Sequence, residues 1–191
     1  MKMYKIERPQ LEIKHDMSPE SPREWCNIGY FIDISSRHIC PDNDETIIEI
    51  VKETGQVAMN QEHHIKLIKK EFEDMGEKIV WIQPVTRYEH GNIYYSLGNS
   101  FGFDFSNSGF YIVTEKTLNE IGTAIKDIER VVTDELNTYN QWVNGEIYSY
   151  ILYDKDGEEK DRMCGFYSIS EIKNYLPKEW ENEELDKYFI G

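Results

Sequence analysis

The sequence predicts an α+β fold: a mainly antiparallel sheet built from hairpins, with helices packed on one face. Two segments that favour strand are each interrupted by a turn rich in Asp, Asn or Gly, at 89–92 and at 154–157, and such turns are typical of hairpins. Apolar residues elsewhere recur at the spacing of an amphipathic helix. Strands and helices do not alternate regularly, so a parallel sheet of βαβ units is disfavoured.

The N-terminal part is expected to lead into the first strand. Residues 1–24 are polar and contain Pro9, Pro19 and Pro22, which predicts an extended lead-in. Residues 28–34 are rich in aromatic and β-branched side chains, so we expect them to form a strand.

Two helices are expected next. Asp44 can cap a helix over 45–53, which Gly55 would end. Asn60 can cap a second helix, in which apolar residues recur at helical spacing until Gly76 stops it.

The central segment is expected to contain a hairpin over 79–97 and a further strand over 109–114. An apolar stripe then predicts the longest helix, over 123–143, with Gly145 just past its end.

A second hairpin is expected over 146–167. Ser168 and Glu171 have the spacing of a capping box before a final helical region. With no repeat or linker in the sequence, we expect one domain over 1–191, comprising the lead-in, the main body and an acidic C-terminal element at 177–191.

The charge balance narrows the choice of partners. The chain has 36 acidic and 21 basic residues, a net charge of −15 at pH 7. The resulting negative field repels nucleic acids and anionic membranes, so neither is expected as a direct partner. The field suits a protein that docks on a basic surface, although acidity can also serve solubility alone.

The cysteines and the N-terminal sequence indicate a location. The three cysteines, Cys26, Cys40 and Cys164, form no C-x-x-C pair, which fits a reducing compartment. The N-terminus lacks the apolar core of a signal peptide, and no apolar run approaches the length of a membrane span. We therefore expect a soluble, intracellular protein.

The histidines do not have the spacing of recognised metal sites. His63 and His64 are adjacent, so on a helix they point in different directions, and His38 and Cys40 lack further ligands nearby. Residues 154–159 resemble the start of a calcium loop but lack its later ligands, and a hairpin turn explains them better. No metal and no cofactor are expected.

Nucleophilic catalysis would need a serine or cysteine beside a histidine and an orienting acid. His90, on the first hairpin turn, and Asp104, in the following loop, are the available partners for Cys164. Phosphate-binding motifs are missing, because the glycines of 98–109 are followed by no G-K-[ST]. Whether the chain is an enzyme stays open, and a protein without catalytic activity is the favoured interpretation.

Several blocks of the sequence share one resemblance. These are S-P-R-E-W-C-N-I-G (21–29), Y-E-H-G (88–91), N-S-G-F-Y-I-V-T (107–114), E-L-N-T-Y-N-Q-W (135–142), N-G-E-I-Y (144–148) and C-G-F-Y (164–167). The chain resembles a family of accessory proteins from phages and mobile elements of Gram-positive bacteria. That family carries S-P-R-E-W-D-N-L-G, a Y-D-H-S-G hairpin, E-T-Y-D-Q-Y-L-T-G-D-V-Y-G and W-G-F-Y-G, and its members have no assigned activity.

The chain departs from the family pattern in two places. Cys26 stands where the family has Asp, and residues 35–38 lack the family's basic, tyrosine-bearing stretch.

The block at 21–29 has two interpretations. In the architectural one, which we favour, Arg23 pairs with an acid, Trp25 fills the core and Gly29 allows a strand to start. In the functional one, part of the block forms a recognition surface, namely Arg23, Glu24, Trp25 and Asn27.

Together the resemblance and the charge lead to a functional hypothesis. The chain is expected to be a phage-type acidic binding protein that antagonises a host defence system, CRISPR-Cas or restriction, by stoichiometric occlusion of a basic groove. The contact candidates are acidic residues in three segments: Asp42, Asp44, Glu45, Glu49, Glu53, Glu129, Asp134, Glu179, Glu181, Glu183 and Glu184. Two alternatives stay open: an enzyme that modifies a host protein or small signalling molecule through Cys164, His90 and Asp104, and a phage regulator that binds host polymerase or replication proteins.

Overall fold

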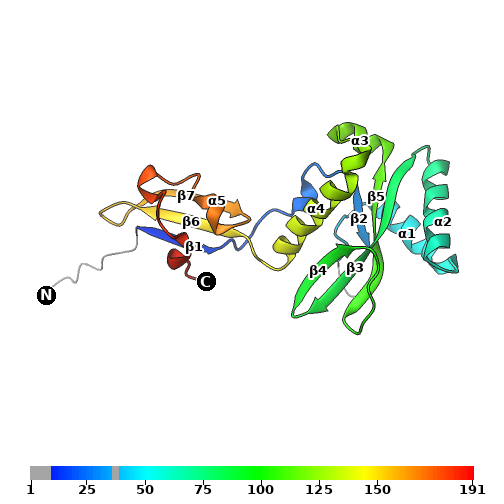
Figure 1. Ribbon diagram of the computed structural model, residues 1–191, viewed down its shortest axis with the longest axis horizontal. Helices are drawn as coiled ribbons and strands as arrows, with labels where there is room; N and C mark the ends of the chain where they lie inside the picture. Colours follow the sequence, from blue (N-terminus) through cyan, green and yellow to red (C-terminus); the bar gives the residue numbers. More distant parts are fainter. Residues whose placement is uncertain (1–9, 36–38) are drawn as a thin grey trace. The chain divides into compact units, whose positions relative to one another are not determined.

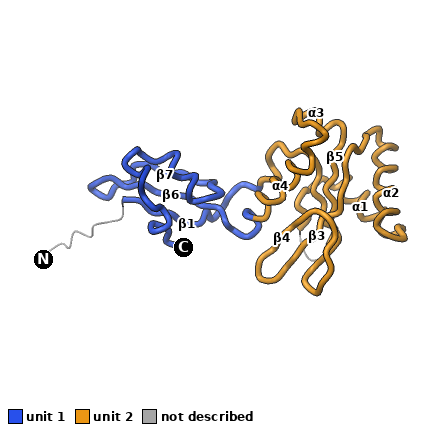
Figure 2. Tube along the Cα trace, viewed as in Figure 1, with its two compact units in different colours: residues 1–21, 141–191 blue, residues 22–140 orange. Residues whose placement is uncertain are grey.

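The computed structural model describes residues 10–35 and 39–191, and it confirms the α+β class (Figure 1). Its contacts divide the chain into two compact units (Figure 2). Unit 1 comprises residues 1–21 and 141–191, and unit 2 comprises residues 22–140. That residues 1–191 form a single domain stays a prediction. The two hairpins, however, lie in different units, so one sheet shared by both is excluded.

Unit 2 is built on a four-stranded antiparallel sheet. Its strands are β2 (Tyr30–Asp33), β3 (Ile79–His90), β4 (Asn92–Leu97) and β5 (Phe105–Thr114), in the order β2-β5-β3-β4. The β3–β4 hairpin is the one predicted from the turn residues. The residue before β2 must be glycine. A Cβ at Gly29 would lie 2.2 Å from the carbonyl oxygen of Ile112 in β5.

Helices α1 (Glu45–Val57) and α2 (Gln61–Asp74) cover one face of this sheet. Their apolar residues form a buried cluster with the strands, comprising Ile47, Val51, Ile68, Phe72, Ile32, Phe110 and Ile112. The two predicted caps are confirmed, since Asp44 accepts from the Ile47 N–H and Asn60 from the His63 N–H. Gly55 does not end α1. It lies within the helix and faces His64, whose Cε1 would be 3.1 Å from a Cβ at that position.

Helix α4 (Ile128–Val143) packs on the opposite face of the sheet. The Tyr139 ring of α4 makes edge contacts with Phe31 of β2 and Tyr95 of β4, at centroid distances of 5.4 Å and 5.7 Å. The prediction that helices pack on one face is therefore wrong for this sheet. The physical reason is that β2 and β5 carry apolar side chains in succession rather than alternately, as in Phe31–Ile32 and Tyr111–Ile112, so both faces need cover.

The expected long helix over 123–143 is interrupted. A separate helix, α3 (Glu115–Ile121), starts directly after β5 with Thr114 as its cap, and the left-handed Gly122 ends it. A three-residue turn, η2 (Ile125–Asp127), then leads into α4.

Unit 1 contains a second antiparallel sheet, with strands β1 (Leu11–His15), β6 (Tyr148–Tyr153) and β7 (Glu159–Phe166) in the order β1-β6-β7. Part of the predicted lead-in is thus a strand of this sheet. The Ser168 cap is confirmed at the start of the short helix α5 (Ile169–Ile172).

The acidic C-terminal element completes the core of unit 1. It contains the turns η3 (Lys178–Trp180) and η4 (Leu185–Tyr188) instead of a continuous helix. Its Trp180 and Leu185 are buried together with apolar residues of the sheet and of α5. This segment therefore folds as part of unit 1 rather than as an appendage.

Candidate functional site

The block at 21–29 surrounds a buried guanidinium. Arg23 lies in η1 (Pro22–Glu24), and only 5% of its side chain is exposed. Its Nε and Nη2 contact the two carboxylate oxygens of Asp42 at 2.6 Å and 2.9 Å, a bidentate pair. Nη1 donates to the Asn27 side-chain oxygen at 2.9 Å, and Nη2 also donates to the Gly29 carbonyl oxygen at 2.8 Å. The predicted pairing of Arg23 with an acid is confirmed.

Glu135 of α4 joins the same network. Its Oε2 lies 3.2 Å from Arg23 Nη1 and accepts a hydrogen bond from the Tyr111 hydroxyl, and its Oε1 accepts from the Ile28 N–H at 2.9 Å. We call Arg23, Asn27, Asp42, Tyr111 and Glu135 the Arg23 network. It connects η1, the segment before α1, β5 and α4, so four distant parts of the chain meet at one charge.

Burial and pairing act in opposite directions on this charge. Burial by itself lowers the pKa of the Arg23 guanidinium, but the interactions with Asp42 and Tyr111 together outweigh it, and the pKa is raised above its usual range. Burial also raises the pKa of Tyr111 well above its usual value, and Glu135 adds to this, against the lowering by Arg23. Arg23 is therefore a charged structural residue.

The network divides the predicted recognition residues into two groups. Arg23 and Asn27 are engaged in it, so they are not offered to a partner. Glu24 and Trp25 point outward, and Trp25 is 48% exposed. The prediction that Trp25 fills the core is wrong, because the inward turn of Arg23 brings the guanidinium, not the indole, into the interior. Of the proposed surface, Glu24 and Trp25 are the residues that a partner could reach.

The acids predicted to contact a partner differ in their availability. Asp42 is held by Arg23, and Asp44 caps α1. Glu45, Glu49 and Glu53 are exposed on α1 at intervals of four residues, on the side away from the buried Ile47 and Val51. With a rise of about 1.5 Å per residue, successive carboxylates are about 6 Å apart along the axis. We call these three residues the α1 acidic row.

The remaining predicted acids are more dispersed. Asp134 forms an exposed pair with Arg130 at 3.3 Å, one turn away on α4, while Glu129 is exposed. In unit 1, Glu183 pairs with Lys187, and the other three predicted acids are exposed: Glu179, Glu181 and Glu184.

A second buried ion pair was not anticipated from the sequence. Arg87 of β3 donates to Asp33 of β2 at 2.9 Å, and both side chains are buried. The Ser108 hydroxyl also donates to Asp33, at 2.8 Å. The available signal was Asp33 at the end of the apolar run of β2. Both carboxylate oxygens of Asp33 are occupied, so the pair stabilises the sheet and leaves no free base.

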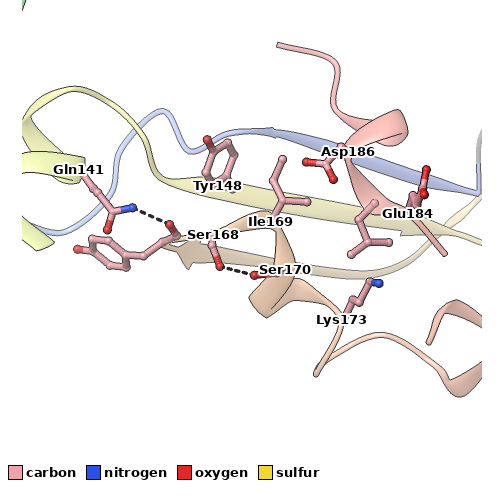
Figure 3. A pocket seen from close by; sticks show the side chains of 10 residues that line it. Gln141, Tyr148, Ser168, Ile169, Ser170, Lys173, Glu184 and Asp186 are labelled. Atoms are coloured by element: carbon pink, nitrogen blue, oxygen red, sulfur yellow. Dashed lines mark hydrogen bonds between the residues drawn. The ribbon is translucent and has the colours of Figure 1, made fainter. Parts of the chain in front are cut away.

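A pocket of about 510 Å³ lies within unit 1 (Figure 3). Its lining includes side chains of both charges, two serines and two tyrosines: Gln141, Tyr148, Tyr167, Ser168, Ile169, Ser170, Lys173, Glu184, Leu185 and Asp186. The Ser168 and Ser170 hydroxyls bond each other at 2.9 Å, and Ser168 also accepts from the Glu171 N–H. Within residues 10–35 and 39–191, these are the hydrogen bonds that the two serine hydroxyls make.

Two of the three predicted catalytic residues lie close together. His90 Nδ1 lies 3.6 Å from the Asp104 carboxylate, and both side chains are exposed. Cys164 is exposed on β7, in the other unit. The enzymatic alternative through these three residues stays a prediction.

The histidines and the turn at 154–159 were the candidate metal-binding features. Within residues 10–35 and 39–191, no three His, Cys, Asp or Glu side chains are grouped as metal ligands would be. His38 lies outside the described residues. Asp154 accepts hydrogen bonds from the N–H groups of Asp156 and Glu158, both at 2.9 Å, as expected of a hairpin turn. These backbone bonds lower the pKa of the Asp154 carboxyl.

In comparisons with family models, with curated proteins and with solved structures, the chain matches none. Among the described residues, no helix is both long enough and apolar enough to cross a membrane.

Proposed function

We propose that the chain is a phage-type acidic protein of the bacterial cytoplasm, which binds a host defence protein and occludes its nucleic-acid-binding surface. The α1 acidic row is the observation that carries the proposal. Its three carboxylates follow one another along a helix whose opposite side is fixed in the core of unit 2. Within the described part of the chain none of the three has an ion-pair partner, so their charge is available to a basic groove.

The mechanism follows from electrostatic complementarity. A basic groove that holds nucleic acid is surrounded by lysine and arginine side chains, and a rigid row of carboxylates can replace phosphates there. The net charge of −15 steers the encounter at long range. Binding would need no catalysis, because occupation of the groove alone excludes the nucleic acid.

The test is competition against purified CRISPR-Cas effector complexes and restriction enzymes, with and without bound DNA. We expect the protein to bind the DNA-free form, to be displaced by added DNA, and to lose affinity steeply between low and high salt. The triple variant Glu45→Lys, Glu49→Lys, Glu53→Lys should abolish binding. Equal affinity for both forms, or affinity independent of salt, would exclude occlusion.

A matched control separates the α1 acidic row from net charge. Glu71, Glu73 and Asp74 are also exposed, on α2, and their reversal to lysine changes the net charge equally. If this control weakens binding as much as the α1 variant does, the acidity acts only through the overall field, and the row is not a contact surface.

A further inference from the structure

The loop between β4 and β5 carries two phenylalanine side chains in solvent. Phe101 is 92% exposed and Phe103 is 106% exposed, relative to a fully accessible reference. Two phenyl rings offer roughly 300–500 Å² of apolar surface. Apolar surface of this extent, carried within three residues of a loop, often marks an interaction site, because it is costly to leave in water. We call residues 98–104 the phenylalanine loop.

Hydrogen bonds fix the base of the phenylalanine loop. The Ser100 N–H reaches Thr86 Oγ1 at 3.1 Å, and the Asn107 amide donates to the Ser100 carbonyl at 2.9 Å. Asn99 and Gln61 of α2 exchange two amide hydrogen bonds, at 2.6 Å and 2.8 Å. The loop is therefore tied to β3, β5 and α2, and the cost of ordering its base is met within the fold. An anchored loop loses less entropy on binding than a free one.

Gly102, between the two rings, has a backbone that only glycine adopts easily. Its φ is +153°, and a Cβ there would lie 2.8 Å from Cδ2 of Phe105. Phe105 in turn contacts the Tyr88 ring at a centroid distance of 5.0 Å. The conformation that directs Phe101 and Phe103 outward is thus specified by the sequence.

The charges around the loop restrict its occupant. Glu89 and Asp104 are exposed acids at the loop. Glu89 lies 3.8 Å from the buried Arg87, whose charge is already paired with Asp33, and Asp104 lies 3.6 Å from His90. An anionic bilayer would be repelled by these acids, and a second copy of this chain would bring a further −15 of charge. An apolar pocket surrounded by lysine or arginine side chains matches both the rings and the acids.

We propose that the phenylalanine loop inserts Phe101 and Phe103 into an apolar pocket with a basic rim on the partner protein. The two rings are the anchor, and Asp104 and Glu89 contact the rim. This inference rests on the proposed function in taking the partner to be a basic protein, and it adds an apolar contact to the electrostatic one.

The partner is first identified through the loop itself. A photoreactive phenylalanine analogue at position 101, in lysate of the source cells, should cross-link to one protein. The same analogue at Tyr175, which is 54% exposed in unit 1, serves as the control. If no protein is cross-linked through position 101 above the level at position 175, the inference is wrong.

The affinity of loop variants for that purified partner then tests whether the two rings are the anchor. The double variant Phe101→Ser, Phe103→Ser should weaken binding about 30-fold or more, as for paired hot-spot residues. Ile125→Ser, at a residue 68% exposed on η2, should bind within about twofold of the unmodified protein. Equal binding by the double variant overturns the inference. Sedimentation with phosphatidylcholine vesicles, or self-association, that is lost in the double variant would also overturn it.

Occlusion by the α1 acidic row and anchoring by the phenylalanine loop can be refuted independently. If the double variant binds weakly while reversal of the α1 acidic row has no effect, the phenylalanine loop is the anchor and occlusion by acids is wrong. If only the acid reversal matters, the inference about the loop is wrong and the proposed function stands.

Discussion

Arg23 shows how one buried charge can organise a surface. A guanidinium removed from water is stable only when its hydrogen bonds are satisfied, and here Asp42, Glu135, Asn27 and Gly29 satisfy them. The same bonds neutralise two carboxylates that would otherwise be costly to bury. Since one of these acids precedes α1 and the other lies on α4, the segment that carries Trp25 is fixed to both helices.

We predict that Arg23→Ala lowers the free energy of unfolding by about 3–5 kcal/mol, because two partly buried carboxylates lose their partner. Arg23→Lys should recover only part of the loss, since one ammonium cannot reproduce the bidentate contact with Asp42. Urea denaturation measures both. The control is Arg130→Ala, which removes an exposed pair with Asp134 and should cost less than about 1 kcal/mol. Equal costs for Arg23→Ala and Arg130→Ala would mean that the Arg23 network does not stabilise the fold.

The pairing of Arg23 with an acid could be predicted from the sequence, because a buried guanidinium needs a negatively charged partner. Arg23 is buried, and it pairs with two acids. The identity of these acids could not be predicted, since Asp42 and Glu135 are 19 and 112 residues away from Arg23 in the sequence. Trp25 was misplaced because hydrophobicity alone does not say which of two neighbouring side chains turns inward.

At the scale of elements, the edge of the unit 2 sheet is closed by a side chain. β4 has only β3 as a strand neighbour, so its outer backbone groups need other partners. The Tyr95 N–H donates to Asn140 Oδ1 at 2.7 Å, and Asn140 Nδ2 donates to the Tyr95 carbonyl at 2.9 Å. The amide of Asn140, on α4, thus takes the place of one residue of a fifth strand.

We predict that Asn140→Ala destabilises the protein by about 2–4 kcal/mol, because a buried N–H and a buried carbonyl each lose a hydrogen bond. It should also increase aggregation, since the edge becomes available to other chains. Urea denaturation and size-exclusion chromatography measure the two effects. Asn137→Ala, an exposed position on the same helix, is the control and should change neither. A stable, monodisperse Asn140→Ala protein would contradict this account of the edge.

Elements were predicted well where local chemistry determines them. Asp44, Asn60 and Ser168 cap helices as expected, and both hairpins turn where the sequence indicated. Long-range packing decided the rest. Gly55 lies inside α1 and does not end it. A glycine is needed there because His64 of α2 occupies the space that a side chain would need. β1 was not recognised as a strand because its register is set by β6, more than a hundred residues later.

At the scale of the whole molecule, each unit has a buried apolar cluster of its own. We predict that Ile13→Ala, in the core of unit 1, accelerates amide hydrogen exchange mainly in 10–21 and 141–191. Ile68→Ala, in the core of unit 2, should do so mainly in 22–140. Each substitution removes packing worth about 2–5 kcal/mol. Peptide-resolved mass spectrometry measures the exchange, and each variant is the control for the other.

Loss of protection over the whole chain in both variants would show that the units unfold as one cooperative body. That result would support the single domain expected from the sequence. Confinement of the loss to one unit would instead establish two units that open separately.

The pairing of β1 with β6 also has a consequence in time. A ribosome adds roughly 5–20 residues per second, so the 133 residues from His15 to Tyr148 take roughly 7–27 s to make. Unit 2, which lies entirely between these strands, can fold during that interval. Leu11 and Ile13, fully buried once β6 arrives, have no sheet to join until then. Nascent chains therefore expose the apolar side chains of β1 while translation continues. A chaperone that recognises exposed apolar segments would bind this protein first at its N-terminal end.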